Sequence, residues 1–350
     1  MSITAKKIEI FCGTGGVGKT TLATSRAVYL ATKNKKVLLI TIDPAKRLKQ
    51  VLGINDEKPG QLHPVDLSIF KNEGVGNLKA LLMHPEATMR RLAVKHSLHD
   101  EFKNPLFQIF TKPYGGMNEI MALLELQYHL ESNEFDTIVL DTPPGKHFID
   151  FLLGARRINN FFDKIYVDIF MHLGKKINHS EVGKSGKILG MLVNTGVKKL
   201  LTYLAKVTGA EFVDYFVDAV SSIYLAKDSF IKGLSLELEL KKVESSNLYL
   251  VTSTEHNKLK DAISLSKKAS SFDHEDHYVI INKCLAEDIH DWVAPLESVE
   301  DKIKSSLIKN EDELLAMSKE HFKKILKFKD ILSLSPQEQV KELVGTWESY

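Results

Sequence analysis

The sequence contains little of what marks a secreted, cysteine-ligated or membrane-spanning protein. Among its 350 residues there are two cysteines, Cys12 and Cys284, and neither belongs to a C-x-x-C motif. A disulfide framework and a cysteine-based zinc site are therefore both disfavoured. No apolar stretch approaches the ~18 to 20 residues that cross a bilayer, and residues 1–7 lack the apolar core of a signal peptide. We therefore expect a cytoplasmic protein without a transmembrane segment.

The sequence also lacks a charge excess of either sign. Its 47 Lys and Arg residues nearly balance 45 Asp and Glu residues, which leaves a net charge of +2. Nucleic acids and anionic membranes attract strongly basic surfaces, so neither is expected as the main partner. The apolar share of 43% is that of an ordinary globular protein with a full core.

What the sequence does contain is an alternation of short β-branched runs and longer helical patterns. The clearest strand candidates are residues 7–12, 36–42, 135–141, 247–253 and 277–282, with a weaker candidate at 66–70. Several are continuous apolar runs, as the central strands of parallel sheets are. The pattern predicts an α/β fold with a doubly wound, mostly parallel sheet.

One motif is present in full. Residues 13–20, Gly13-Thr14-Gly15-Gly16-Val17-Gly18-Lys19-Thr20, match G-x-x-x-x-G-K-[ST] between an apolar strand and a helical pattern over 20–32. The backbone N–H groups of such a loop, here Gly13 to Thr21, surround phosphate at the positive end of the following helix. Lys19 then neutralises the β- and γ-phosphate oxygens, and the Thr20 hydroxyl ligates Mg²⁺. The motif predicts a P-loop protein that binds and hydrolyses a nucleotide.

Two carboxylates follow predicted strands at the sheet edge where ligands bind in such folds. Asp43 lies in Thr41-Ile42-Asp43-Pro44-Ala45, and Asp141 begins Asp141-Thr142-Pro143-Pro144-Gly145-Lys146-His147. An Asp after an apolar strand of a P-loop protein commonly holds Mg²⁺, directly or through water. For each of them, a surface Asp that ends a strand is the alternative.

We predict that residues 1–350 form a single P-loop domain. Its nucleotide core then comprises residues 1–74, 133–150 and 245–350. Residues 75–132 and 151–244 have helical periodicity and no convincing strand, and a crossover needs only a dozen or so residues. We interpret both as helical insertions that form an extra helical layer. Near the end, Ser335 is expected to cap a last helix that begins at Pro336.

Together the three motifs resemble a known family. Residues 13–21, 41–45 and 141–147 look like the nucleotide motifs of the arsenite-pump and tail-anchored-protein-targeting ATPases, in particular the bacterial anion-transporting ATPase-like branch. The resemblance implies that Asp43 positions or activates the attacking water and that Asp141 lies near Mg²⁺. It also implies a homodimer with ATP and Mg²⁺ as ligands, and an unknown protein client or membrane-protein partner.

The resemblance further implies that Asn282, which ends the apolar run Tyr278–Ile281, reads adenine. GTPases read guanine with Asn-Lys-x-Asp, but here the run is Asn282-Lys283-Cys284-Leu285, which lacks the guanine-reading carboxylate. ATP is therefore favoured over GTP. An Asn that caps the next helix is the alternative.

The sequence departs from the family pattern at two positions. Thr14 stands where the family carries a signature lysine, and Lys146 stands where its second switch has a glycine, one residue after Gly145. We predict that Lys146 supplies part of the missing positive charge at the phosphate; a solvated loop lysine is the alternative. Since two scattered cysteines cannot form a thiolate cluster, an arsenite-pump subunit is not expected.

Three functions remain open from the sequence. The first is an ATP-driven conformational switch that binds and releases a client, such as a hydrophobic protein segment. The second is a positioning or partitioning-type scaffold ATPase, although the near-neutral C-terminus offers no basic amphipathic anchor. The third is a slow ATP-binding sensor that lacks the signature lysine. The apolar residues of 151–244 fit either a client groove or the insertion's own core.

Overall fold

The computed structural model describes residues 3–42, 51–52, 60–70, 76–96, 117–145, 244–269, 277–331 without 291, 294 and 297, and 335–350, together with the single residues 206, 229, 232, 236 and 240. Two residues of the predicted site, Asp43 and Lys146, lie outside these ranges, as does nearly all of the predicted insertion 151–244.

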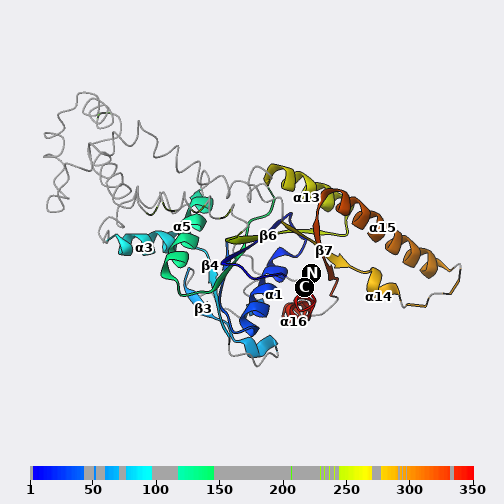
Figure 1. Cartoon of the computed structure of the whole chain (residues 1–350), viewed down its shortest axis with the longest axis horizontal. Coiled ribbons are helices and arrows are strands. Elements are labelled where there is room, and N and C mark those ends of the chain that lie inside the picture. Colours follow the sequence, from blue (N-terminus) through cyan, green and yellow to red (C-terminus); the bar gives the residue numbers. More distant parts are fainter. Residues whose placement is uncertain are drawn as a thin grey trace. The chain divides into compact units, whose positions relative to one another are not determined.

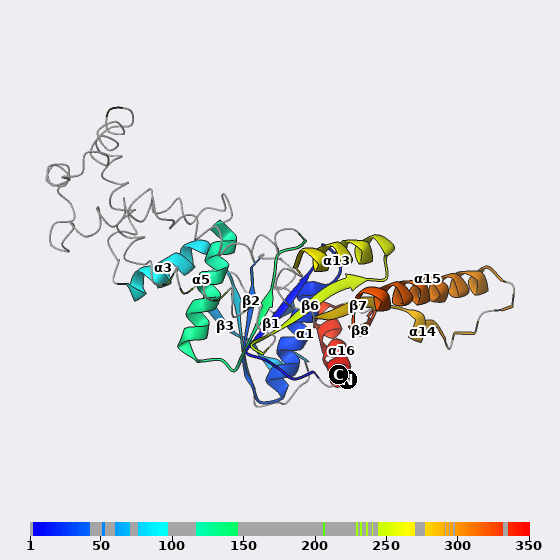
Figure 2. The same ribbon diagram turned by 45° about the horizontal axis from the view of Figure 1, so that its top comes forward.

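A parallel sheet forms the centre of the described part of the chain (Figures 1 and 2). Its eight described strands follow the order β3-β4-β2-β5-β1-β6-β7-β8, and every neighbouring pair is parallel except β3 with β4. This order confirms the predicted doubly wound, mostly parallel α/β fold. The strands are β1 Ile8–Gly13, β2 Lys36–Thr41, β3 Leu62–Pro64, β4 Asn77–Leu82, β5 Thr137–Asp141, β6 Ser246–Ser253, β7 Tyr278–Cys284 and β8 Lys324–Lys329.

The chain divides into two compact units, residues 1–83, 128–150 and 238–350 in the first and 84–127 and 151–237 in the second. The whole sheet belongs to the first unit. The single-domain interpretation of the chain stays a prediction. The described helices are α1 Lys19–Thr32, the 3₁₀ helix η1 Leu67–Phe70, α3 Pro85–Lys95, α5 Met117–Ser132, α13 His256–Ala269, α14 Ala286–His290, α15 Val299–His321 and α16 Pro336–Trp347.

The five clear strand predictions are confirmed as β1, β2, β5, β6 and β7, with ends that shift by no more than two residues. The weaker prediction at 66–70 is wrong, because Leu67–Phe70 form η1. There the Asp66 carboxylate accepts a hydrogen bond from the Ser68 backbone N–H, 2.9 Å away, which favours a turn over a strand.

Three described strands escaped the sequence reasoning, and the shortest of them is β3. β4 lies inside the stretch 75–132, where no strand was expected, and β8 was not predicted at all. Both are interrupted by lysines, so neither has the continuous apolar run of a central strand. In β4, Lys79 reaches Glu134 at 2.5 Å and lies over the ring of Phe135. β8 is one of the two edge strands of the described sheet, and lysines on an edge strand oppose pairing with another chain.

The core on one face of the sheet is built from α1 and α16, which pack against each other. Trp347 of α16 is fully buried, and its Nε1–H donates to Ser25 Oγ of α1 at 2.8 Å. Phe11 of β1 stacks on Tyr249 of β6 with ring centroids 4.6 Å apart. The Ser335 side chain accepts from Glu338 N, and α16 begins at Pro336, which confirms the predicted cap.

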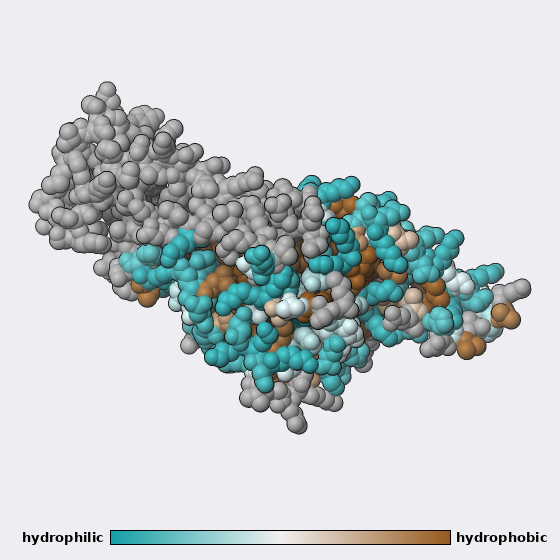
Figure 3. Space-filling model, in the orientation of Figure 1, coloured by the Kyte–Doolittle hydropathy of each residue, from teal (hydrophilic) through white to brown (hydrophobic). Residues whose placement is uncertain are grey.

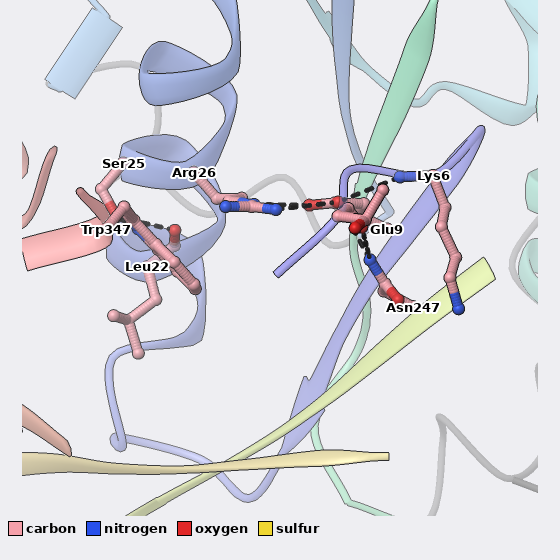
Figure 4. Close-up of polar contacts among 8 residues, drawn as sticks. Lys6, Glu9, Leu22, Ser25, Arg26, Asn247 and Trp347 are labelled. Atoms are coloured by element: carbon pink, nitrogen blue, oxygen red, sulfur yellow. Dashed lines mark hydrogen bonds and ion pairs between the residues drawn. The ribbon is translucent and has the colours of Figure 1, made fainter. Parts of the chain in front are cut away.

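A buried ion pair joins α1 to β1 within this core (Figure 4). The Arg26 guanidinium donates to Glu9 through Nε at 2.7 Å and through Nη2 at 3.1 Å. Arg26 also lies over the Trp347 ring, 4.8 Å from its centroid, so one cation connects β1, α1 and α16. Burial alone lowers the pKa of Arg26, but the charge and hydrogen bonds of Glu9 raise the pKa above its ordinary value.

Candidate nucleotide site

The loop between β1 and α1 has a backbone that requires glycine at two positions. Gly13 ends β1 with φ 148°, and a Cβ there would lie 2.2 Å from the carbonyl oxygen of Val251 on β6. Gly18 caps α1 in the left-handed conformation, φ 94°, and a Cβ there would meet the Asn282 amide at 2.4 Å. The loop therefore needs these glycines for close approach to neighbouring strands as well as for its turns.

Lys19, Thr20 and Asp141 meet at the carboxyl edge of the sheet. Lys19 is buried at the start of α1, and its Nζ donates to the Thr14 carbonyl oxygen at 3.0 Å. The Thr20 hydroxyl donates to Asp141 Oδ2 at 2.8 Å, and Thr41 Oγ1 donates to the same oxygen at 3.1 Å. Register brings these groups together, since Asp141 pairs with Phe11 on one side and with Thr41 on the other.

These groups fit a magnesium–nucleotide complex. A hydroxyl and a carboxylate that converge within 2.8 Å are the hard oxygen ligands that Mg²⁺ prefers, directly or through water. Two further hydroxyls of the loop, Thr14 Oγ1 and Thr21 Oγ1, are buried without a hydrogen-bond partner among the described residues. Buried hydroxyls are normally hydrogen-bonded, so both are suited to phosphate or ribose oxygens.

The loop after β5 lies directly against the P-loop. Thr142 donates to the Phe11 carbonyl oxygen from its N–H at 3.2 Å and from its hydroxyl at 2.8 Å. Gly145, with φ 59°, donates its N–H to the carbonyl oxygen of Gly13 at 2.9 Å. The next residue along the chain is Lys146, and its predicted role lies outside the described residues.

Asn282 lies near the end of β7, and its side chain touches the P-loop. Its Nδ2 donates to the Val17 carbonyl oxygen at 2.8 Å, and the residue is 7% exposed. A cavity of about 410 Å³ opens beside it, within the usual range for small-molecule sites. The cavity is lined by Gly16, Gly18, Thr21, Asn282, Lys283, Lys329, Asp330, Ile331, Gln339 and Leu343.

A larger hollow of about 1200 Å³ lies between α14, β8 and α16. Its lining contains no residue of the phosphate loop and includes charged side chains of both signs. The smaller cavity beside Asn282 is therefore the better candidate for a nucleotide base and ribose.

Sequence reasoning missed one residue of this site, Lys258 on α13. Its Nζ donates to the carbonyl oxygen of Gly15 at 3.1 Å. The loop therefore carries two ammonium groups on adjacent carbonyls, Lys19 on Thr14 and Lys258 on Gly15. No local motif marks Lys258, because 243 residues separate it from the glycine that it contacts.

The described residues contain no group of three or more His, Cys, Asp or Glu side chains that could hold a metal ion. Cys12 and Cys284 are both free and buried. Burial raises the pKa of the Cys12 thiol far above its ordinary value and the pKa of Cys284 to about 12. Cys12 on β1 and Cys284 on β7 are also separated by β6 in the sheet, so these two thiols do not form a shared thiolate site.

The site thus combines a loop with the P-loop motif, a hydroxyl and a carboxylate in direct hydrogen bond, and a cavity beside Asn282. The family model described as Anion-transporting ATPase matches residues 6–333. The chain belongs to the anion-transporting ATPase family. This confirms the resemblance read from the three nucleotide motifs.

Individual relatives of the anion-transporting ATPase family show the same likeness. The chain is 33% identical to ATPase GET3 of Malassezia globosa over 144 residues, 41% of each protein. It is 26% identical to ATPase GET3 of Eremothecium gossypii over 264 residues, 70% of this chain and 73% of that protein. It is 30% identical to the putative arsenical pump-driving ATPase 2 of Aquifex aeolicus over 166 residues, 45% of this chain and 52% of that protein.

The match to GET3 proteins such as that of Malassezia globosa spans about two fifths of the length of those proteins. The family and the relatives are all described as ATPases, in agreement with the enzyme class that the P-loop predicts. Among the helices of the described ranges, none is both long and apolar enough to cross a membrane.

Proposed function

We propose that this chain binds ATP with Mg²⁺ at the loop 13–21 and hydrolyses it to ADP and phosphate. The observation that carries the proposal is the meeting of Lys19, Thr20 and Asp141 at one edge of the sheet, with Thr20 and Asp141 in direct hydrogen bond. Family membership supports the same reaction.

Each residue of the site has a task that follows from its chemistry. The N–H groups of the loop and the ammonium of Lys19 hold the β- and γ-phosphate oxygens. Thr20 and Asp141 hold Mg²⁺, which when bound neutralises charge on the phosphates. Asp43 is assigned, through the family resemblance, to orient the attacking water and take up its proton.

The geometry of Asn282 supports adenine as the base. Its Nδ2 donates to the Val17 carbonyl oxygen, which fixes the amide and leaves Oδ1 as an acceptor for a ligand. The exocyclic amino group of adenine donates hydrogen bonds, whereas guanine carries an acceptor oxygen at the same ring position. We therefore assign the cavity beside Asn282 to adenine and its ribose.

Hydrolysis at this site would act as a conformational switch that binds and releases a protein client, with a homodimer as the working unit. The structural support is the bond from Gly145 N–H to the Gly13 carbonyl, which ties the loop after Asp141 to the phosphate loop. Loss of the γ-phosphate would alter both loops at once. Arsenite transport is not part of this proposal, because Cys12 and Cys284 lie on strands that β6 separates and do not form a thiolate cluster.

The decisive experiment is calorimetric titration of Lys19→Ala with ATP in the presence of Mg²⁺. Lys19 contacts phosphate directly, so ATP and ADP binding should fall below detection. Lys33→Ala is the matched control, since Lys33 caps the other end of α1 and pairs there with exposed Glu348. ATP binding by Lys19→Ala with the affinity of the unmodified chain would remove the phosphate site. Competition between GTP and ATP for the unmodified chain tests the base, and equal competition would refute the adenine assignment.

A further inference from the structure

Exposed large apolar side chains are concentrated in one short stretch of the first unit. Eight such side chains occur among the described residues, and six of them lie between positions 292 and 307. Single exposed apolar residues are normal on protein surfaces, but a contiguous group marks an interaction site. The six are Trp292, Val293, Leu296, Val299, Ile303 and Leu307, of which Val293 is 90% and Leu296 91% exposed.

These side chains lie on a projecting arm, residues 286–307, made of α14, the loop after it and the first part of α15. The arm extends past the edge of the sheet in both ribbon views (Figures 1 and 2), and apolar surface is visible at its far end in Figure 3. Val299, Ile303 and Leu307 repeat every four residues and form a stripe along one side of α15. The same stripe continues to Leu314, which is buried against the body.

The arm is held in a defined conformation by polar contacts. Lys304 Nζ donates to the carbonyl oxygens of His290 at 2.8 Å and Trp292 at 2.5 Å, which joins α15 to the end of α14. Ser298 caps α15 through the Asp301 N–H at 3.0 Å. At the base of the arm, buried Glu311 accepts from Leu285 N and Ala286 N. A surface that is already ordered loses little entropy when a partner binds.

Charge decides which kind of partner fits. The arm 286–307 contains six acidic residues and two lysines, Lys302 and Lys304, so its net charge is negative. Two such segments packed on each other would repel, which disfavours contact between the arms of two copies. An anionic membrane would repel the arm as well. A positively charged partner is favoured.

We propose that the arm 286–307 is a docking site for an amphipathic helix of another protein, with an apolar face flanked by Lys or Arg. The apolar face would cover the stripe from Val299 to Leu307 and the side chains of Val293 and Leu296. The basic flanks would meet Glu300 and Asp301, whereas Asp288 already pairs with Lys329 at 3.0 Å. The partner helix would lie along an exposed apolar face, with Trp292 as an aromatic anchor. The site lies outside the nucleotide pocket and does not depend on hydrolysis.

The test uses the full chain and two synthetic helical peptides of about 18 residues, each with a leucine face of period 3.6. One peptide carries lysines on its polar face, and the other carries glutamates. Fluorescence anisotropy should show binding of the lysine peptide at least tenfold tighter than the glutamate peptide. The double variant Val293→Ser with Leu296→Ser should lose at least tenfold in that affinity, and Glu300→Lys should weaken it too. Val94→Ser, an exposed valine of α3, is the matched control.

The Lys19→Ala variant should bind the lysine peptide like the unmodified chain, which separates this proposal from the nucleotide site. Equal binding of the two peptides, or no effect of the Val293 and Leu296 changes, would overturn the proposal. A dimer in light scattering that the double serine variant dissociates would replace the partner helix by a second copy. Binding of the arm to vesicles of phosphatidylcholine and phosphatidylglycerol, lost in the same variant, would replace it by a membrane.

Discussion

The hydroxyl of Thr20 donates a hydrogen bond of 2.8 Å to the carboxylate of Asp141, although 121 residues separate them in the sequence. Thr20 follows the P-loop lysine on α1, and Asp141 ends the strand beside β1. Their contact exists because β5 pairs in register with β1, so that both chain segments reach the same edge of the sheet. It is the geometric reason for placing Mg²⁺ at this position.

Asp141→Asn should keep the fold and weaken Mg²⁺ binding by about 10- to 100-fold, the range seen when supporting ligands of a metal are changed. The amide preserves size but removes the negative charge that favours the cation. Titration of Mg²⁺ into the chain with a fluorescent ATP analogue measures the effect. Asp136→Asn is the control, because Asp136 lies just before the same strand and its carboxylate accepts a hydrogen bond from the Lys36 N–H, away from Thr20. Equal Mg²⁺ affinity in the two variants would count against Asp141 as a ligand.

Asp43→Asn should retain nucleotide and Mg²⁺ binding but lose hydrolysis by about 10²- to 10⁴-fold, the usual contribution of a general base. The change removes the basicity that orients and deprotonates water. Phosphate release under saturating ATP measures the loss of hydrolysis. Asp66→Asn, a change at an exposed aspartate, is the control. A loss of less than about tenfold would show that another group holds the water.

The positive charge of the missing signature lysine has two candidate sources, Lys146 and Lys258. Preorganised charge near a transferring phosphoryl group contributes a few kcal/mol, so removing the right lysine should slow turnover by about ten- to a thousandfold with ATP binding little changed. Lys258 contacts the Gly15 carbonyl, and Lys260 on the same helix is exposed and serves as control.

Phosphate release by Lys146→Ala and Lys258→Ala, measured under saturating ATP, distinguishes the two lysines. Lys258→Arg should restore activity if charge at that position matters. Thr14→Lys should recover part of the activity of the impaired variant, provided that the dimer presents Thr14 to the partner site. Changes below about threefold in both alanine variants would favour the slow-sensor function over a switch.

Glu9→Gln should destabilise the first unit by about 3–5 kcal/mol, because it leaves the Arg26 charge buried and unpaired. Adding Arg26→Met should recover much of the loss, because it removes the unpaired buried charge. Urea unfolding followed by the fluorescence of Trp347, in a Trp292→Phe background, reads the region directly, as Trp347 lies against Arg26. Glu348→Gln, which breaks the exposed pair with Lys33, should cost less than about 1 kcal/mol. Similar losses in both variants would contradict a special role for the buried pair.

Several features of this protein followed from the sequence alone, and they share a local origin. The P-loop needs glycines at fixed spacing because backbone N–H groups must face a phosphate, and that requirement is written in eight consecutive residues. Central strands such as β2 are continuous apolar runs, because both faces of a parallel sheet are covered. The Ser335 cap and the Pro336 start of α16 depend on four residues. Residue type and spacing within one short segment mark each of these, so each can be predicted from the sequence.

Other features were decided only by the tertiary structure. β4 and β8 carry lysines and became strands because a neighbouring strand offered its backbone for pairing, which no single segment reveals. Residues 67–70 looked extended but form a 3₁₀ helix because Asp66 bonds to Ser68.

The Lys258 contact depends on packing between distant segments, and in sequence Lys258 looks like any surface lysine. The Glu9–Arg26 pair depends on the packing of α1 against β1. The apolar stripe of α15 reads in sequence as an ordinary core-facing pattern. Only the fold shows that its buried part ends at Leu314 and that the remainder, from Leu307 to Val299, extends into solvent, because the strands and helices that bury the C-terminal half of α15 do not reach as far as the arm.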